Sequence, residues 1–346
     1  MLDDALTAAL LDGNVAALAR AVSIVENGRP GFEDLLATLH PRLGQARRIG
    51  LTGPPGAGKS TMTERLVSTF RSQGLKVAVV AVDPTSPFTG GALLGDRIRM
   101  ESVALDPGVY IRSMATRGSL GGLATATREV CDVLDAAGFQ RIIVETVGVG
   151  QSELDVTRMA DSTALILVPE SGDGIQTLKS GIIEAADLFV VNKADRPGAE
   201  KLRKELEMSL DLRSGKVSRQ VPAHHGALRS GAPARAAAEA TDPKVWRPPV
   251  LVTTASKNEG IGPVVAAFEE HWSWLENSGM LEQRRRTRLA QRTREVVERA
   301  MRRWLWQESH ADEMITSRLD EVSAGRTSPY ELATEIVAAL KEGARV

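Results

Sequence analysis

Apolar and polar residues follow two different patterns along the chain, and the first of these is helical. Between residues 3 and 26, apolar side chains recur at spacings of three to five, with an interruption at Asp12-Gly13-Asn14. This pattern predicts two short amphipathic helices joined by a turn. A further helix is predicted from Gly31 to about Leu39, because Pro41 disfavours helix at the residue before it. Residues 1–45 are therefore predicted to form an N-terminal helical segment.

From Arg48 onward, short and almost wholly apolar runs alternate with helical stretches. Uniformly apolar runs predict strands that are buried on both faces, and helical stretches between them predict a parallel sheet. We therefore predict an α/β fold with a mostly parallel sheet of about seven strands over residues 46–275. The runs are RRIGLT, LKVAVVAVD, VYIRSM, QRIIVETVG, STALILVPE, ADLFVVNKAD and PPVLVTTAS.

Two further regions depart from this alternation. Residues 213–245 are rich in Ala, Gly, Arg and Ser, which predicts an exposed insertion in the α/β domain. From about Gly262 the pattern is helical to the end, with a turn near Gly325 to Pro329. Residues 276–346 are therefore predicted to be a C-terminal helical extension.

Composition and charge narrow the class of protein. With 42% apolar and 25% charged residues, the chain has the usage of a soluble globular protein, which excludes a disordered or fibrous one. Its formal charge of -1 provides no overall field for nucleic acid or an acidic membrane, so neither partner is predicted. The single cysteine, Cys131, excludes an intrachain disulfide and a multi-thiolate zinc site. With no leader pattern at the start and no long apolar run, we predict a cytoplasmic protein.

A glycine-rich loop directly after the first predicted strand fits the pattern G-x-x-x-x-G-K-[ST]. Backbone N–H groups of such a loop and the start of the following helix can wrap a phosphate group. Lys59 is predicted to reach the outer phosphates, and the Ser60 hydroxyl to bind Mg²⁺. The residues predicted to bind nucleotide here are Gly53, Pro54, Pro55, Gly56, Ala57, Gly58, Lys59, Ser60 and Thr61.

Two later motifs predict which base is bound. Asn192-Lys193-Ala194-Asp195 follows a predicted strand and matches the N-K-x-D motif of GTPases. The Asp195 carboxylate can accept hydrogen bonds from the ring N–H and the exocyclic amine of guanine, and adenine lacks that amine. Thr254-Ala255-Ser256, after the last strand, resembles the S-A-x element that closes over guanine through a backbone N–H. GTP is therefore the predicted nucleotide.

Three carboxylates are predicted at the same edge of the sheet as the phosphate loop. Asp83 and Glu145 end predicted strands, and Asp96 lies in the loop between them. Mg²⁺ prefers oxygen ligands and needs only one or two carboxylates beside phosphate and water. Together with Ser60, these three residues form the predicted metal site, and the sequence does not say which of them binds the ion in which nucleotide state.

The residues after Glu145 predict a switch and a slow reaction. Glu145-x-x-Gly148 occupies the place of the D-x-x-G switch, whose glycine amide can sense the outer phosphate. Val149 follows, where many small GTPases carry the glutamine that orients water, so slow intrinsic hydrolysis is predicted. Gln151 could assist instead. The arginines available to neutralise developing charge are Arg97, Arg99, Arg112, Arg117 and Arg158.

Taken together, these motifs resemble the MeaB family, the methylmalonyl-CoA mutase-associated GTPases, also labelled LAO/AO or ArgK-type transport kinases. The resemblance implies a G protein that hydrolyses GTP while it protects an adenosylcobalamin-dependent acyl-CoA mutase and gates loading of its cofactor. It implies metal and switch roles for Asp83, Asp96 and Glu145, and a third-switch role for Lys179. The segments that carry it are GNVAALARAVSIVEN, GPPGAGKST, AVDPTSPFTGGALLGDRIRM, RGSLGGLATATRE, ETVGVGQSE, GDGIQTLKSGIIEAAD and NKAD.

The C-terminal extension contains a basic helix. Residues 282–303 hold nine arginines against three glutamates, a local charge of +6, and an apolar stripe at helical spacing. The stripe is typical either of a helix that packs on the α/β domain or of a contact with a second copy or a partner. The family resemblance implies a homodimer through this extension.

Two alternative functions remain open from the sequence. A GTP-dependent kinase would need a base that activates an acceptor hydroxyl, and the sequence offers no separate candidate. A metallochaperone-type GTPase would need His- or Cys-rich motifs, whereas this chain has five histidines and one cysteine.

Overall fold

The computed structural model describes residues 4–84, 100–116, 122–146, 152–170, 180–213 and 245–343. The chain divides into two compact units, Met1–Glu282 and Gln283–Val346. The first unit contains the whole sheet, and the second contains helices alone among its described residues.

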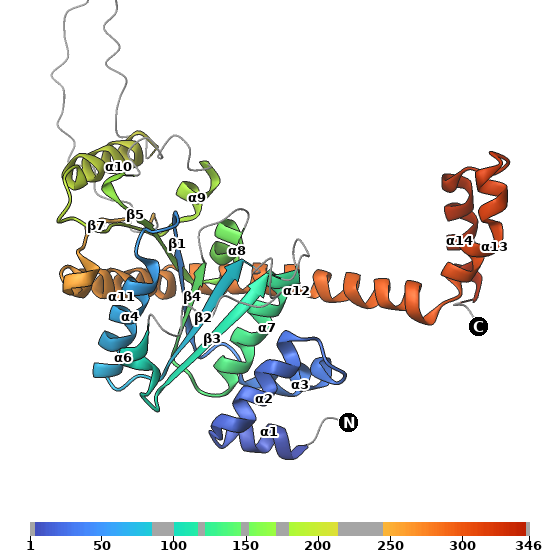
Figure 1. Ribbon diagram of the computed structural model, residues 1–346, viewed down its shortest axis with the longest axis horizontal. Coiled ribbons are helices and arrows are strands. Elements are labelled where there is room, and N and C mark those ends of the chain that lie inside the picture. Colours follow the sequence, from blue (N-terminus) through green and yellow to red (C-terminus); the bar gives the residue numbers. More distant parts are fainter. Residues whose placement is uncertain are drawn as a thin grey trace, which may run out of the picture. The chain divides into compact units, whose positions relative to one another are not determined.

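A parallel sheet of seven strands forms the centre of the first unit, in the order β3-β2-β4-β1-β5-β6-β7 (Figure 1). Each of its strand pairs is parallel, which confirms the predicted α/β fold. Buried β-branched and aliphatic side chains on both faces explain why the runs are so uniformly apolar. The strands are β1 (Arg47–Thr52), β2 (Val77–Pro84), β3 (Val109–Thr116), β4 (Arg141–Thr146), β5 (Ser162–Leu167), β6 (Leu188–Val191) and β7 (Val250–Val252).

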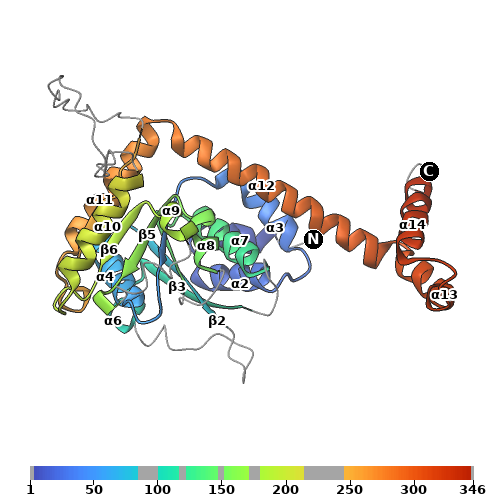
Figure 2. The same cartoon turned by 90° about the horizontal axis from the view of Figure 1, so that it is seen from above.

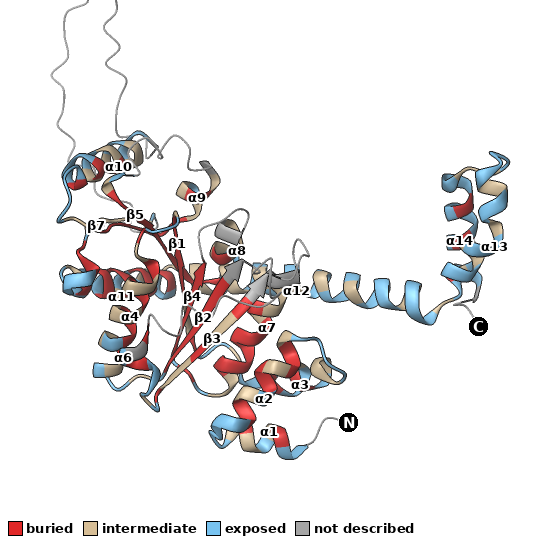
Figure 3. Cartoon of the chain, in the orientation of Figure 1, coloured by how far each residue is buried: buried red, intermediate tan, exposed pale blue. Residues whose placement is uncertain are grey.

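Helices cover both faces of the sheet, and burial is concentrated between the layers (Figures 2 and 3). Successive residues of β5 point to opposite faces, so Leu165 and Leu167 join one core while Ala164 and Ile166 join the other. One face is covered by α7 (Gly122–Ala136), α8 (Ser152–Met159), α9 (Ser180–Ala185) and α10 (Ala199–Arg213). The opposite face is covered by α4 (Lys59–Ser72), α6 (Glu101–Ala104) and α11 (Ile261–Asn277).

The N-terminal helices α1 (Asp4–Leu11), α2 (Val15–Glu26) and α3 (Phe32–Leu39) pack against α7 and share its core. Asn14 caps α2 by accepting a hydrogen bond from the backbone N–H of Ala17 at 2.9 Å, as expected for the predicted turn. After the short 3₁₀ turn η1 (His40–Arg42), the chain enters β1 through residues 44–46.

One carboxylate on α7 holds this entry segment. The Asp135 side chain accepts hydrogen bonds from the backbone N–H groups of Gly44, Gln45 and Ala46 at 2.8 to 3.1 Å. Asp132, one turn earlier, accepts from Arg48 at 2.7 Å. Burial opposes the charged form of Arg48, but the charge and hydrogen bond of Asp132, together with the charges of its other neighbours, outweigh burial and raise the pKa of the guanidinium. A single side chain, that of Asp135, thereby satisfies three successive backbone donors, of which that of Ala46 is buried.

Cys131 lies on α7 in the same core and is fully buried. Burial raises the pKa of its thiol to about 12, because the thiolate would lose its hydration. The side chain is therefore a neutral, apolar packing group at physiological pH.

The second unit begins within the long helix α12 (Met280–Arg303), none of whose residues is buried. It continues through the π-helical turn η4 (Trp304–Glu308), α13 (Ala311–Ser323) and α14 (Pro329–Gly343). A small core of Ala311, Leu332 and Ile336 joins the last two helices. The turn between them falls where Gly325 and Pro329 predict one.

Several predictions fall outside the described residues. The insertion predicted at 213–245 coincides almost wholly with residues 214–244, of whose structure nothing is described.

Over the described ranges, no helix is both long enough and apolar enough to cross a membrane.

Candidate functional site

The phosphate loop connects the end of β1 to the start of α4, at the carboxyl edge of the sheet. Ligands of open α/β sheets bind at this edge. Gly53 has a φ of 138°, and a Cβ at this position would lie 2.0 Å from the backbone oxygen of Ile166. Gly58 has a φ of 87°, and its Cβ would lie 2.4 Å from the side-chain nitrogen of Asn192. The motif therefore needs glycine at both positions for conformation and for space.

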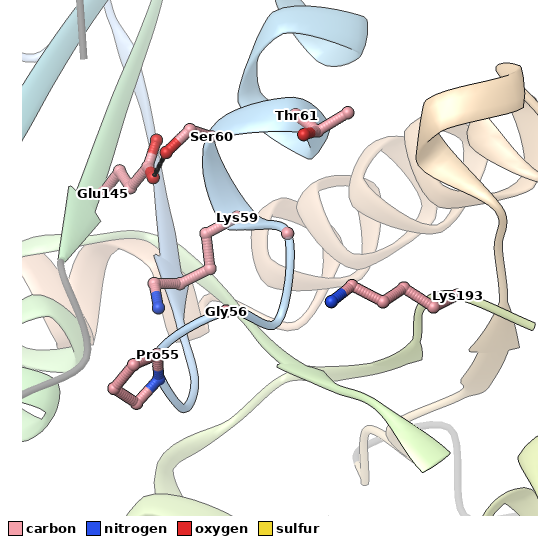
Figure 4. Close-up of a pocket in the computed structure, with 8 residues that line it drawn as sticks. Pro55, Gly56, Lys59, Ser60, Thr61, Glu145 and Lys193 are labelled. Carbon is pink, nitrogen blue, oxygen red and sulfur yellow. Dashed lines mark hydrogen bonds between the residues drawn. The ribbon is translucent and has the colours of Figure 1, made fainter. Parts of the chain in front are cut away.

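A cavity of about 470 Å³ opens above this loop. Its lining joins the loop and the start of α4 to one residue of β4 and one that follows β6 (Figure 4). Lys193 enters the cavity from the side opposite Glu145. The lining residues are Pro55, Gly56, Gly58, Lys59, Ser60, Thr61, Glu145 and Lys193.

Lys59 is buried at the first position of α4, with 6% of its surface exposed. Its ammonium group donates hydrogen bonds to the backbone oxygens of Gly53 and Pro54, at 2.8 and 3.0 Å. The charge is thus held by the loop itself, at the start of a helix whose N–H groups also attract anions. The arrangement places a buried cation where phosphate oxygens would enter.

Glu145, near the end of β4, contacts the same helix with both of its carboxylate oxygens. Ser60 Oγ donates to Glu145 Oε1 at 2.5 Å, and Thr63 Oγ1 donates to Oε2 at 2.7 Å. The carboxylate is almost wholly buried, at 1% exposure. β4 is hydrogen-bonded directly to β1, with Glu145 paired with Leu51 in register, and this pairing brings β4 beside the phosphate loop.

The donor set at this position fits Mg²⁺. Ser60 and Glu145 offer hydroxyl and carboxylate oxygens, the ligands that Mg²⁺ prefers, and phosphate and water complete such sites in nucleotide-binding proteins. Among the residues that the structure describes, no group of three or more His, Cys, Asp or Glu side chains could hold a metal ion.

The base-side motifs meet around the Asn192 side chain. Its Nδ2 donates to the backbone oxygen of Ala57 at 2.8 Å, and its Oδ1 accepts from the Ala255 N–H and the Thr253 hydroxyl, both at 3.1 Å. Asn192 therefore ties the phosphate loop to the segment after β7. Lys193, the next residue, has a left-handed φ of 57°, which is uncommon for a residue with a side chain.

Asp195 and the turn η3 (Ala255–Lys257) form the open side of this region. Asp195 Oδ2 lies 3.2 Å from Lys257 Nζ, and both side chains are substantially exposed. Thr254 is buried, and its backbone pairs with Glu259 in an isolated antiparallel bridge. The Asp195 carboxylate is therefore accessible to the base of a nucleotide.

Sequence reasoning missed the residues that brace these motifs. Arg65, on α4, donates to the backbone oxygen of Ala255 at 3.1 Å and so links the phosphate helix to η3. Thr63, Thr253 and Lys257 also contact motif residues. For Thr63 a signal existed, since residues three apart on a helix share a face and Thr63 follows Ser60 by three. For the others no local pattern pointed to the site.

Other predicted site residues are placed only in part. The backbone of Asp83 lies near the end of β2, two residues beyond Ala81, which pairs with Glu145. Its side chain lies outside what the structure describes, as do Asp96, Gly148 and Lys179 entirely. Among the candidate arginines, Arg112 donates to Glu26 on α2 at 2.8 Å, and Arg158 lies 3.9 Å from Asp155.

The fold and the described half of the site define a P-loop NTPase with a guanine-reading motif, the class of GTPases. A family model described as "Methylmalonyl Co-A mutase-associated GTPase MeaB" matches residues 18–310. The chain belongs to the MeaB family, as its motifs suggested, and is a GTPase.

Three relatives show how far the similarity extends. A putative GTPase of Pyrococcus abyssi is 46% identical over 85% of this chain and 83% of its own length. A probable GTPase of Mycobacterium bovis is 38% identical over 96% of this chain and 94% of its own. The crystal structure of a LAO/AO transport system kinase covers 99% of both chains with 28% identity and a TM-score of 0.65. The similarity therefore includes the helical segments at both ends.

Proposed function

We propose that this GTPase is a chaperone of an adenosylcobalamin-dependent acyl-CoA mutase, which it protects and whose cofactor loading it gates. The observation that carries the proposal is the match to the mutase-associated family over residues 18–310, a range that reaches beyond the sheet into the C-terminal helices. A large effect of a partner is physically reasonable, since groups that complete a GTPase site raise turnover by about 10³ to 10⁵.

We assign the site residues as follows. Lys59 holds the outer phosphates, Asn192 and Asp195 recognise guanine, and Lys193 with Thr254, Ala255 and Ser256 completes the base side. Ser60 and Glu145 hold Mg²⁺, which neutralises phosphate charge when bound. Asp83, Asp96, Gly148 and Lys179 are proposed as metal and switch residues on the sequence alone. A cytoplasmic location and the absence of nucleic-acid binding also stay predictions.

The proposal is tested by mixing the purified chain with purified acyl-CoA mutases of different specificity and measuring phosphate release from GTP. We expect one mutase to raise kcat at least tenfold, because it would order a site that is predicted to be slow alone. The same mixture with Lys59→Ala protein controls for contaminating GTPases. Using γ-labelled GTP, transfer of label to protein in place of free phosphate would overturn the proposal and favour the kinase alternative.

We further propose that the second unit forms a homodimer contact. An apolar cavity of about 460 Å³ lies within this unit, and Met301, Trp306 and Val337 on its rim are each about half exposed. Trp and Met are favoured in the buried centres of interfaces. Its lining residues are Met301, Arg302, Trp304, Leu305, Trp306, Val337, Leu340 and Lys341. A second copy of the chain is the occupant that the family resemblance implies.

Replacement of Trp306 by glutamate is expected to convert the dimer to a monomer at micromolar concentration, because a charge would be buried at the apolar centre of the contact. Light scattering coupled to size exclusion measures the mass. Leu105→Glu, at an exposed apolar residue of the first unit, is the matched control and should stay dimeric. A wild-type chain that is monomeric at 100 micromolar would exclude the contact.

A further inference from the structure

Thr63 is a fully buried hydroxyl residue on α4, one turn after the Ser60 of the phosphate loop. Its Oγ1 donates to Glu145 Oε2 at 2.7 Å, while Ser60 Oγ donates to Oε1 at 2.5 Å. Two hydroxyl groups on one helix face therefore hold the two oxygens of one carboxylate. The contact joins residues that are 82 positions apart in the chain.

Other hydroxyl side chains of the same helix behave differently. Ser68 and Thr69 donate to backbone oxygens four residues earlier, those of Glu64 and Arg65, each at 2.9 Å. This back-bonding is the ordinary use of Ser and Thr inside a helix. A hydroxyl has one proton to donate, so the Thr63 bond to Glu145 takes the place of such a bond. The Thr63 hydroxyl is thus committed to Glu145 rather than to its own helix.

A donor on each oxygen of a buried carboxylate opposes rotation of the group about its last bond. With donors on both oxygens, the plane of the Glu145 carboxylate is set by α4, the helix that also carries Lys59 and Ser60. Ser60 Oγ can offer a lone pair to a cation while its hydroxyl proton still donates a hydrogen bond to Glu145 Oε1. The direction of the Glu145 oxygens then depends on Thr63, which lines no part of the cavity.

We propose that Thr63 is a positioning residue that sets the orientation of Glu145 and thereby the strength with which the site holds Mg²⁺ beside the nucleotide. The inference rests on the proposed role of Glu145 at the metal. Thr63 itself is not among the residues that line the cavity. Its effect should therefore appear in every property that depends on Mg²⁺ and in none that depends on the nucleotide alone.

The test uses the full chain with the variants Thr63→Val, which keeps the shape and removes the hydroxyl, and Thr63→Ser, which keeps the hydroxyl. The dissociation rate of fluorescently labelled GDP is measured over a range of Mg²⁺ concentrations and in EDTA. In the Thr63→Val variant, we expect the Mg²⁺ concentration that gives half of the maximal effect on the rate of GDP release to be about tenfold higher than in the wild type. The reason is that a buried acceptor oxygen of Glu145 loses its donor. Thr63→Ser should behave like the wild type, and all three proteins should agree in EDTA.

The inference would be overturned if Thr63→Val and the wild type showed the same dependence on Mg²⁺. It would also be overturned if Thr63→Val changed the rate of GDP release in EDTA as much as it does in Mg²⁺. If the valine variant does not fold by circular dichroism, Thr63→Ala, which introduces no extra atoms, takes its place. The variant Glu145→Gln distinguishes the proposed role of Glu145 at the metal from the role of Thr63 in orienting Glu145. No change of Mg²⁺ dependence in Glu145→Gln refutes the proposed role of Glu145, whereas a change there without one in Thr63→Val refutes the inference about Thr63 alone.

Discussion

Replacement of Lys59 by alanine is expected to lower kcat/KM for GTP hydrolysis by about 10²- to 10³-fold, the range seen when one preorganised donor is removed from a transition state. Lys59 is the buried cation of the cavity, and its ammonium lies on the backbone oxygens of Gly53 and Pro54. Phosphate oxygens that gather charge would lose both the cation and a hydrogen bond. Phosphate release from GTP under single-turnover conditions measures the loss.

A matched control comes from a lysine that is not among the residues lining the cavity. Lys204 on α10 is an exposed residue whose ammonium lies 3.9 Å from Glu200. Lys204→Ala should keep wild-type turnover, since an exposed ion pair contributes little. Turnover by Lys59→Ala within threefold of the wild type would refute the assignment of the phosphate site.

Replacement of Asp195 by asparagine is expected to weaken GTP binding by about 10²-fold and to strengthen binding of xanthosine triphosphate by a similar factor. The carboxylate offers two acceptor oxygens to the ring N–H and amine of guanine, whereas an amide offers one acceptor and one donor. Xanthine carries a carbonyl where guanine carries the amine, so the amide donor suits it. Competition of both nucleotides against a fluorescent GDP analogue measures the exchange of preference.

The neighbouring Lys257 provides the control for this second prediction. Its Nζ lies 3.2 Å from Asp195 Oδ2, with side-chain exposures of 55% and 40%. Because solvent screens such a pair, Lys257→Met should change GTP affinity by less than about tenfold without changing the preferred base. A preference for GTP that survives Asp195→Asn would mean that another residue reads the base.

Much of the fold was predictable from the sequence because local pattern and final environment agree. The runs from RRIGLT to PPVLVTTAS each contain a short apolar stretch, and each became a strand of a sheet that is covered on both faces. The turns at Asp12-Gly13-Asn14 and near Gly325 carry residues that favour turns. Where the sequence pattern agrees with the burial of a segment in the fold, the pattern is enough to predict its secondary structure.

The motifs of the candidate site were predictable from the sequence, because each answers a local structural demand. The contacts between the motifs were not predictable. Gly53 and Gly58 stand where a Cβ would collide with Ile166 or Asn192, so the glycine spacing of the loop records a steric demand. The Thr63 bond to Glu145 has no such record. It exists because β4 lies next to β1 in the sheet while β2 and β3, which come between them in the sequence, lie further out.

By itself, the sequence determined the order of strands and helices, the phosphate loop and the guanine-reading aspartate, since each depends on the chemistry of a few adjacent residues. Only the tertiary structure decided which groups face one another. Thr63 lies on Glu145, Asn192 joins the phosphate loop to the segment after β7, and the Asp135 carboxylate holds residues 44–46. These contacts follow from the crossing order of the strands, a property of the whole sheet that no local pattern encodes.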